Sequence, residues 1–189
     1  MANKVIILHG CADPEEADPA QRFYDKHWIP WTKQQLEARG FVVETPLMPH
    51  PWTPDYDAYK KEFETYSVSE NDILVGHSCA AAFLTRWLGE TGQKIRKVIF
   101  VAPWKIADST NEARVAFYGH PIDPSVRALI GELVIFTSDD EEEDGKKSAQ
   151  IFHEALGGRV VELSHHGHYI IEHMHTEEFP ELIEEIIQS

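Results

Sequence analysis

The chain has 189 residues, of which 42% are hydrophobic and 26% are charged, a balance typical of globular proteins rather than disordered ones. We expect one domain over residues 1–189, because this length is sufficient for a single hydrophobic core. The formal net charge of −15 comes from 17 basic and 32 acidic residues and repels phosphate backbones and anionic lipids. We therefore expect neither a nucleic acid nor a membrane as a partner.

The amino-terminal stretch MANKVIILHG contains an apolar run only from Val5 to Leu8. That run is too short for the apolar region of a signal peptide or for a membrane span. The two cysteines, Cys11 and Cys79, are too few for a disulfide scaffold. These features predict a cytoplasmic protein in a reducing compartment.

Short apolar runs alternate with longer amphipathic segments along the chain. The runs rich in Val and Ile predict strands over residues 4–8, 41–45, 72–76, 97–102, 132–137 and 159–163. The intervening segments predict helices over residues 28–39, 55–66, 79–90, 146–156 and 177–188, with a shorter pair within 109–130. Most of the strands are apolar nearly throughout, as expected where both faces of a sheet are covered. The alternation predicts a three-layer α/β domain: a six-stranded parallel sheet with helices on both faces.

A lone hydroxyl stands where the third strand gives way to a helix. The residues Gly76-His77-Ser78-Cys79-Ala80 fit the nucleophile elbow G-x-S-x-G, except that alanine replaces the last glycine. Small residues flank such a serine because the turn is strained and larger side chains would collide with neighbouring backbone. The pentapeptide alone equally fits Ser78 as an ordinary helix N-cap.

A nucleophilic serine needs a base and an acid that orients the base, and in this type of sheet the chain order is serine, acid, histidine. Asp139 and Asp140 both follow the fifth strand, and we prefer Asp140 because the first residue past a strand more often completes the turn. His168 follows the sixth strand. Gly167 before it would let the loop turn the imidazole toward Ser78.

Backbone N–H groups must also stabilise an oxyanion. One is expected from Cys79, at the amino terminus of the helix after Ser78, where the helix dipole favours negative charge. The other is expected from the loop after the first strand, where Gly10 permits close approach of the backbone. Cys11 or Ala12 would donate there, and we prefer Cys11.

Several stretches are together more specific than the elbow, namely VIILHG, HWIPWTKQQLEARGF (27–41), LMPHPWTP (47–54), GHSCA, SDD and GHY. On these stretches the chain resembles, over nearly its whole length, the small α/β-hydrolase-fold serine hydrolases that include retinoblastoma-binding protein nine and related bacterial proteins. The resemblance implies a compact parallel sheet and a triad of Ser78, Asp140 and His168. The acid of that family is usually followed by apolar residues and a proline, whereas this chain reads EEED, so Asp139 stays open beside Asp140.

The aromatic residues Trp52, Trp104 and Phe117 are candidates for the wall of an acyl pocket, although plain core packing explains each of them equally well. The segment 103–131, where this fold usually inserts a lid, is too short for a large one. The clustered histidines His165, His166, His168, His173 and His175 straddle a turn and a helix start, so we predict no metal site and no cofactor. The run DDEEED (139–144) is expected to be a solvated acidic loop.

These observations predict a carboxylesterase-like serine hydrolase that cleaves small soluble acyl esters or thioesters. The alternative is a protein-interaction module that keeps the hydrolase scaffold with little or no catalysis, since a fold does not guarantee an activity. The sequence identifies no particular protein partner for that alternative.

Overall fold

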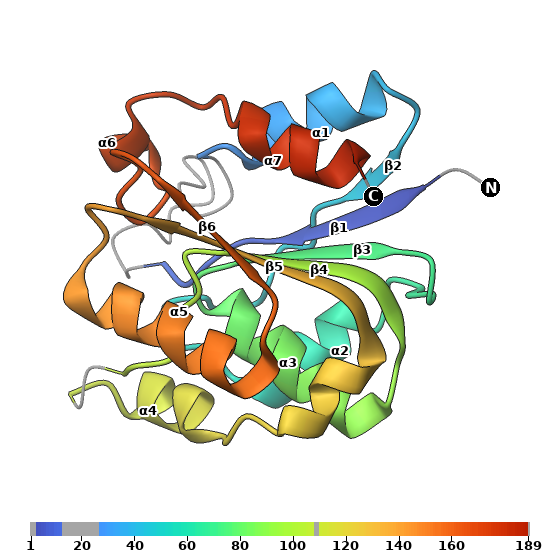
Figure 1. Ribbon diagram of the computed structural model, residues 1–189. Coiled ribbons are helices and arrows are strands. Elements are labelled where there is room, and N and C mark those ends of the chain that lie inside the picture. Colours follow the sequence, from blue (N-terminus) through green and yellow to red (C-terminus); the bar gives the residue numbers. More distant parts are fainter. Residues whose placement is uncertain (1–2, 13–26, 108–109, 189) are drawn as a thin grey trace.

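Six parallel strands form one sheet in the order β2-β1-β3-β4-β5-β6 in the computed structural model, which describes residues 3–12, 27–107 and 110–188 (Figure 1). The strands are β1 (Lys4–Leu8), β2 (Val42–Glu44), β3 (Ile73–His77), β4 (Ile95–Val101), β5 (Ile130–Ser138) and β6 (Arg159–Leu163). The register pairs Leu8 of β1 with Gly76 of β3, and Val101 of β4 lies between His77 and Phe136. The predicted fold class is confirmed.

The composition of each strand follows its place in the sheet. All five residues of β3, at the centre, are buried, as are four of the five in β1. The edge strand β6 reads RVVEL and has no buried residue, so its charged residues remain in contact with water. An edge strand that carries charge is also protected against pairing with another chain.

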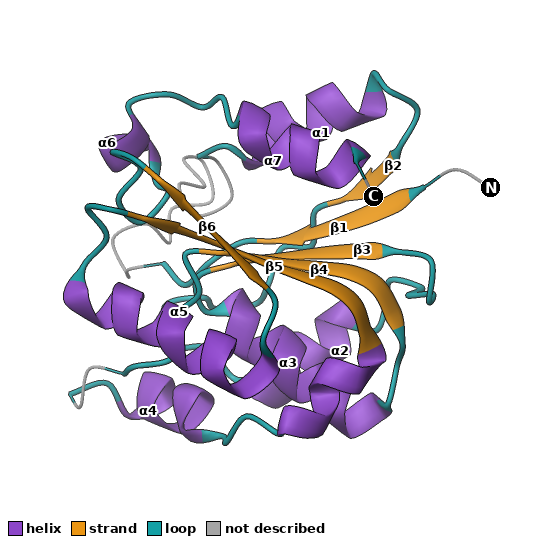
Figure 2. Cartoon of the chain, in the orientation of Figure 1, coloured by secondary structure: helices purple, strands orange, loops and turns teal. Residues whose placement is uncertain are grey.

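Helices cover both faces of the sheet (Figure 2). They are α1 (Ile29–Glu37), α2 (Tyr56–Phe63), α3 (Ala80–Thr91), α4 (Glu112–Gly119), the 3₁₀ helix η3 (Pro124–Leu129), α5 (Glu143–Leu156), α6 (Ile171–Met174) and α7 (Pro180–Ile187). Helices α1 and α7 pack on one face, whereas α2, α3 and α5 pack on the other. Each face therefore has its own apolar cluster.

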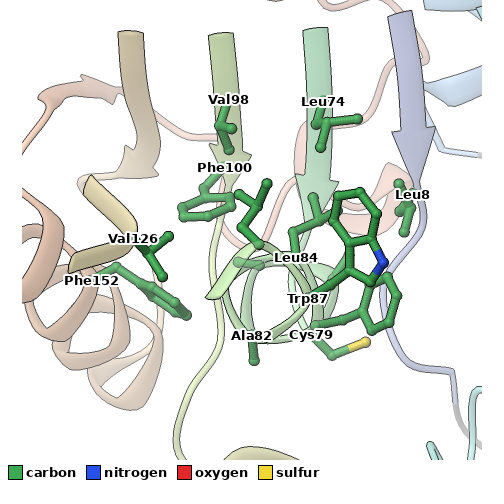
Figure 3. Packing of buried hydrophobic residues seen from close by; sticks show 14 of the residues in the cluster. Leu8, Leu74, Cys79, Ala82, Leu84, Trp87, Val98, Phe100, Val126 and Phe152 are labelled. Atoms are coloured by element: carbon green, nitrogen blue, oxygen red, sulfur yellow. The ribbon is translucent and has the colours of Figure 1, made fainter. Parts of the chain in front are cut away.

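The helix α3 lies beneath the central strands, and its sequence AAAFLTRWLGET is apolar on nearly all sides as a result. Figure 3 shows Leu84 and Trp87 of α3 packed below Leu74 of β3 and Phe100 of β4. A helix buried all round is held firmly, because each large side chain removed from water contributes about 1.5–3 kcal/mol. This helix begins directly after Ser78.

The bounds of the expected helices and strands differ from those observed by at most three residues at any end. Helix α5 begins at Glu143 rather than at residue 146, because Glu143 and Asp144 are acidic residues in a first turn, where the helix dipole stabilises them. The short helix α6 was not expected, since a single turn has too few residues to show a period.

The carboxyl ends of the strands lie at one edge of the sheet, as they must in a parallel arrangement. The loops after β1, β3, β5 and β6 therefore converge there. Within the described part of residues 103–131 only α4 and η3 are helical, so no large lid is present in that part. None of the helices that the structure describes has the length and apolar character needed to cross a membrane.

Candidate active site

Ser78 occupies a strained turn between β3 and α3. Its φ angle is +53°, in the left-handed region that costs a non-glycine residue about 1–2 kcal/mol. The turn is held from both sides, because the Ser78 amide donates to the carbonyl of Val101 at 3.0 Å and the Ser78 carbonyl accepts from the amide of Trp104 at 3.1 Å. The fixed backbone presents the hydroxyl at the carboxyl edge of the sheet.

The residues two positions before and after Ser78 are small because the turn leaves little space, as expected from the sequence. A Cβ on Gly76 would lie 3.0 Å from a Leu84 methyl and 3.2 Å from the backbone of Ala80, so glycine is needed there. Ala80, which replaces the second glycine of the motif, is fully buried. The alternative of Ser78 as a helix N-cap is wrong: Cys79 is the N-cap, and the Ser78 hydroxyl is bonded elsewhere.

His168 and Ser78 lie together, although 90 residues separate them. The Nε2 atom of His168 is 2.9 Å from the Ser78 Oγ. The edge of one ring meets the face of the other where Trp104 packs on His168, with ring centroids 5.1 Å apart and planes at 90°. This contact limits the positions that the imidazole can take.

A different carboxylate from the expected one contacts His168. Glu141 Oε2 lies 2.9 Å from His168 Nδ1, and the Glu141 side chain is only 1% exposed. Since a carboxylate accepts hydrogen bonds, Nδ1 carries the proton and Nε2 is left to accept from the Ser78 hydroxyl. The expectation that Asp140 holds the imidazole is therefore wrong, and so is its alternative, Asp139.

Glu141 reaches His168 because a glycine leaves room for its side chain. A Cβ on Gly145, in the first turns of α5, would lie 2.6 Å from both Cγ and Cδ of Glu141. The second carboxylate oxygen of Glu141 accepts from the amide of Glu142 at 2.9 Å, which fixes the group further. The run DDEEED is thus not a uniformly solvated loop, since Glu141 is buried within it.

Asp139 and Asp140 bind the backbone of the histidine loop instead. Asp139 Oδ1 accepts from the amide of His165 at 2.9 Å, and Asp140 Oδ1 accepts from the amide of Gly167 at 2.8 Å. The hydrogen bond from the backbone of His165 lowers the pKa of Asp139. The pKa of Asp140 is lowered by the hydroxyl of Ser138 and by the amide of Gly167. Both groups hold the loop that carries His168.

The loop after β1 approaches Ser78 closely. A Cβ on Gly10 would lie 2.9 Å from the Cβ of Ser78, so only glycine fits there. The amide of Ala12 donates to the carbonyl of Pro51 at 3.4 Å, which turns this N–H away from Ser78. The geometry therefore favours Cys11 over Ala12 as a donor, beside Cys79 at the start of α3.

A pocket of about 440 Å³ opens above Ser78. Trp104 lines it, but the other two predicted wall residues do not. Phe117 is buried in the core, with its ring 5.2 Å from that of Tyr59, and Trp52 packs on His50 with ring centroids 5.6 Å apart. Several lining residues were not expected from the sequence, because they lie on irregular loops, on α4 and on the single turn α6: His27, Arg114, Tyr118, Ile170 and His173.

Three ligand-type side chains gather at the end of β5. One ligand atom each from Asp139, Asp140 and His165 lies within 4.8 Å of the others, and all three residues are exposed. Both carboxylates already accept hydrogen bonds from the histidine loop. Exposed acidic groups of this kind are common without a metal, so we assign none to this group.

The chain was compared with protein families and with curated protein sequences. A family model described as serine hydrolase matches residues 20–187. The comparison with curated protein sequences found no match.

Solved structures share the fold at low sequence identity. The ydeN gene product from B. subtilis is 21% identical with a TM-score of 0.83, over 99% of this chain and 98% of that one. A putative ydeN-like hydrolase from Pectobacterium atrosepticum is 19% identical with a TM-score of 0.62, over 96% and 88%. The pyrethroid hydrolase PytH is 13% identical with a TM-score of 0.63, over 100% and 98%.

Proposed function

The chain belongs to the serine hydrolase family, and from that premise we propose that Ser78, His168 and Glu141 form its catalytic triad. The single observation that carries the proposal is the continuous chain of contacts at 2.9 Å from the Ser78 hydroxyl through the imidazole to the Glu141 carboxylate. A nucleophile within hydrogen-bond reach of a base, with the base oriented by a third group, is the arrangement that nucleophilic catalysis requires.

The reaction would proceed through an acyl-enzyme. Ser78 Oγ attacks the acyl carbon while His168 Nε2 takes the hydroxyl proton and then gives it to the leaving group. The Glu141 carboxylate stabilises the imidazolium, because it accepts the hydrogen bond from Nδ1–H throughout. Water then attacks the acyl carbon while His168 Nε2 takes a proton from it. The same proton returns to Ser78 Oγ as the acid is released.

The developing oxyanion would be held by the backbone N–H groups of Cys11 and Cys79. Their positions, one on the glycine loop and one at the start of α3, suit a negative charge on the attacked carbonyl oxygen. Loss of one such donor typically costs about 10²–10³ in kcat. The side chains of the two cysteines have no part in this step.

The substrate class that we propose is small acyl esters or thioesters, which makes the protein carboxylesterase-like. A pocket of about 440 Å³ is suited to a small molecule rather than to a folded protein. The short segment that holds α4 and η3 argues against a lipase that acts on aggregated lipid. The pyrethroid hydrolase PytH is a hydrolase with a similar fold.

Within the serine hydrolases, we propose kinship with the group of retinoblastoma-binding protein nine. The support is the sequence motifs alone, HWIPW and MPHP with the elbow GHSCA. The cytoplasmic location also stays a prediction, based on the two cysteines and the apolar run at the amino terminus.

A fluorophosphonate probe tests the proposal directly, since it reacts only with an activated serine. We expect the wild type to be labelled and Ser78→Ala not to be, together with a loss of about 10⁶ in kcat on p-nitrophenyl esters. Equal labelling of both proteins would reject the assignment. A series of p-nitrophenyl esters of increasing acyl length would then measure the pocket.

The same probe tests the alternative of a protein-interaction module without catalysis. A pure binding module would not react with the probe. The buried carboxylate of Glu141, in contact with His168, favours a catalytic function over a pure binding module.

A further inference from the structure

His77 is the residue before the nucleophile, and it is almost fully buried, at 3% exposure. Its ring lies among other rings, with its centroid 5.9 Å from that of Trp28, 5.3 Å from that of His168 and 6.2 Å from that of His27. Packing alone would be served equally well by an apolar side chain at this position. The polar atoms of His77 therefore call for an explanation.

One ring nitrogen of His77 has a specific partner. Its Nε2 lies 2.9 Å from the backbone carbonyl oxygen of His168. A carbonyl oxygen only accepts hydrogen bonds, so Nε2 carries the proton. Among the residues that the structure describes, none hydrogen-bonds to the other nitrogen, Nδ1, although that atom is buried.

The imidazole of His77 carries a proton on Nε2 alone because the ring stays neutral. Burial, followed by the neighbouring His168 and His27, lowers the pKa of His77 well below its ordinary value. A neutral imidazole with Nε2 protonated is a fixed donor to the carbonyl of His168. Because His77 is uncharged, it also adds no repulsion when the ring of His168 takes up a proton.

The nucleophile and its neighbour thus contact one residue at two points. Ser78 Oγ meets the ring of His168 at 2.9 Å, and His77 Nε2–H meets the main chain of the same residue at 2.9 Å. Two contacts between adjacent residues on one strand end and a single residue on a distant loop fix both the position and the direction of that residue. Asp139 and Asp140 hold the same loop at His165 and Gly167, whereas the contact from His77 acts on the main chain of His168 itself.

We propose that His77 is a positioning residue, whose Nε2–H holds the main chain of His168 so that the imidazole stays within reach of the Ser78 hydroxyl. The inference rests on the proposed function, since positioning matters only if His168 acts as the base. It assigns a role to the second residue of the elbow, for which the G-x-S-x-G motif makes no demand.

Two substitutions separate the hydrogen bond from simple packing. His77→Met fills the space without a donor, whereas His77→Gln keeps an N–H near the position of Nε2. We expect His77→Met to lower kcat, and the rate of fluorophosphonate labelling, by about 10²-fold, with KM changed by less than about twofold, as for a small misplacement of a reacting group. We expect His77→Gln to recover kcat to within about tenfold of the wild type.

A matched control measures the effect of lost stability alone. Val98, on β4, is fully buried in the opposite half of the core and does not line the pocket. Val98→Ala should lower the melting temperature and leave kcat unchanged. Equal values of kcat in His77→Met and the wild type would overturn the inference, and so would an equal loss in His77→Met and His77→Gln.

A spectroscopic measurement keeps the inference testable if His77→Met does not fold. Ring ¹⁵N chemical shifts of the wild type should assign to His77 a protonated Nε2 and an unprotonated Nδ1 at neutral pH. A protonated Nδ1 would overturn the inference whether or not the protein is active. If the probe does not label the wild type, the proposed function is rejected. The ring ¹⁵N shifts of His77 give its tautomer independently of that result.

Discussion

The two ends of the sheet both bury polar side chains, but these side chains differ in backbone strain and in how completely they are paired. At the carboxyl end, Ser78 sits in a left-handed turn and His77 has a buried ring nitrogen without a partner in the described chain. Toward the amino end, Lys97 on β4 is just as buried, yet its ammonium group is surrounded by partners. The strained turn fixes the position of the Ser78 hydroxyl, whereas the paired ions at Lys97 only hold elements of the fold together.

The network at Lys97 joins α7 to the sheet. Lys97 Nζ donates to the carboxylate of Glu185 at 2.5 Å, to the carbonyl of the same residue at 2.8 Å, and lies 3.0 Å from Glu132. Arg159 on the edge strand donates to the other oxygen of Glu185 at 2.6 Å. Charge is balanced within the group, as buried ions require. Changes at the two ends should therefore separate activity from stability.

The largest effect is expected at Glu141, the acid of the proposed triad. Glu141→Gln keeps the shape of the side chain but removes the charge that stabilises the imidazolium, so kcat should fall by about 10⁴-fold. Asp140→Asn is the matched control, because an amide oxygen still accepts from Gly167, and its kcat should stay within about tenfold of the wild type. Steady-state kinetics on a p-nitrophenyl ester measures both. A larger loss in Asp140→Asn than in Glu141→Gln would restore the residue expected from the sequence.

The next effect is expected at the opposite end and on a different quantity. Lys97→Met removes the buried cation that bonds to Glu185, so the free energy of unfolding should fall by about 3 kcal/mol. The value of kcat should not change. Urea unfolding gives the stability, and Lys147→Met is the control, since Lys147 pairs with Asp144 on the surface and that pair contributes at most about 0.5 kcal/mol. A loss of kcat without a loss of stability would contradict the division between the two ends.

A substitution in α5 should lower activity without lowering stability. In Gly145→Ala the new methyl group would occupy the space of the Glu141 side chain and displace its carboxylate, so kcat should fall by about 10²-fold. Alanine favours a helix over glycine by about 1 kcal/mol, which offsets the cost of the displacement. Thermal unfolding and kinetics test the two parts.

Gly89 offers the matched control for this substitution. It lies in α3, and a Cβ there meets only a methyl group of Val126, at 3.2 Å. Gly89→Ala should leave kcat unchanged. If both alanine variants lost activity equally, the special role of Gly145 would be disproved.

The smallest effect concerns acid stability. Burial would raise the pKa of Glu185, but the hydrogen bonds from Arg159 and Lys97 outweigh it and lower the pKa. The folded pKa lies below the unfolded value of about 4.3, so the contribution of the ionised group is complete above that pH and is lost as pH falls through the folded pKa. The difference in free energy of unfolding between wild type and Glu185→Gln should be constant above about pH 5 and shrink below it. A difference that does not vary with pH would show that the charge of Glu185 is unimportant.

Much of the fold could be predicted because its strands are apolar runs between clear breaks. The strands at 4–8 and 159–163 have the predicted bounds, and the other four differ by two residues or fewer at each end. The order of the strands could not be predicted, since it depends on which long-range pairs form. The single turn α6 is fixed by its place between two loops and has no sequence pattern of its own.

The positions of Ser78 and His168 could be predicted because Ser78 follows β3 directly and His168 lies on the loop after β6. The contact of Glu141 could not, because it depends on the reach of a longer side chain and on free space in the next helix. One signal was present: Gly145 stands inside a helix, where glycine is unfavourable without a packing reason. The sequence also could not show that Trp104 lines the pocket and Phe117 does not, because this depends on which side of each segment faces the core.

The space that Gly145 leaves for Glu141 bears on how sites of this kind are recognised in other sequences. A search that inspects only the position at which the fifth strand stops would select a solvent-facing aspartate here and overlook the carboxylate that contacts His168. A glutamate followed four places later by a glycine, at the opening of the next helix, is a signature that such a search should include.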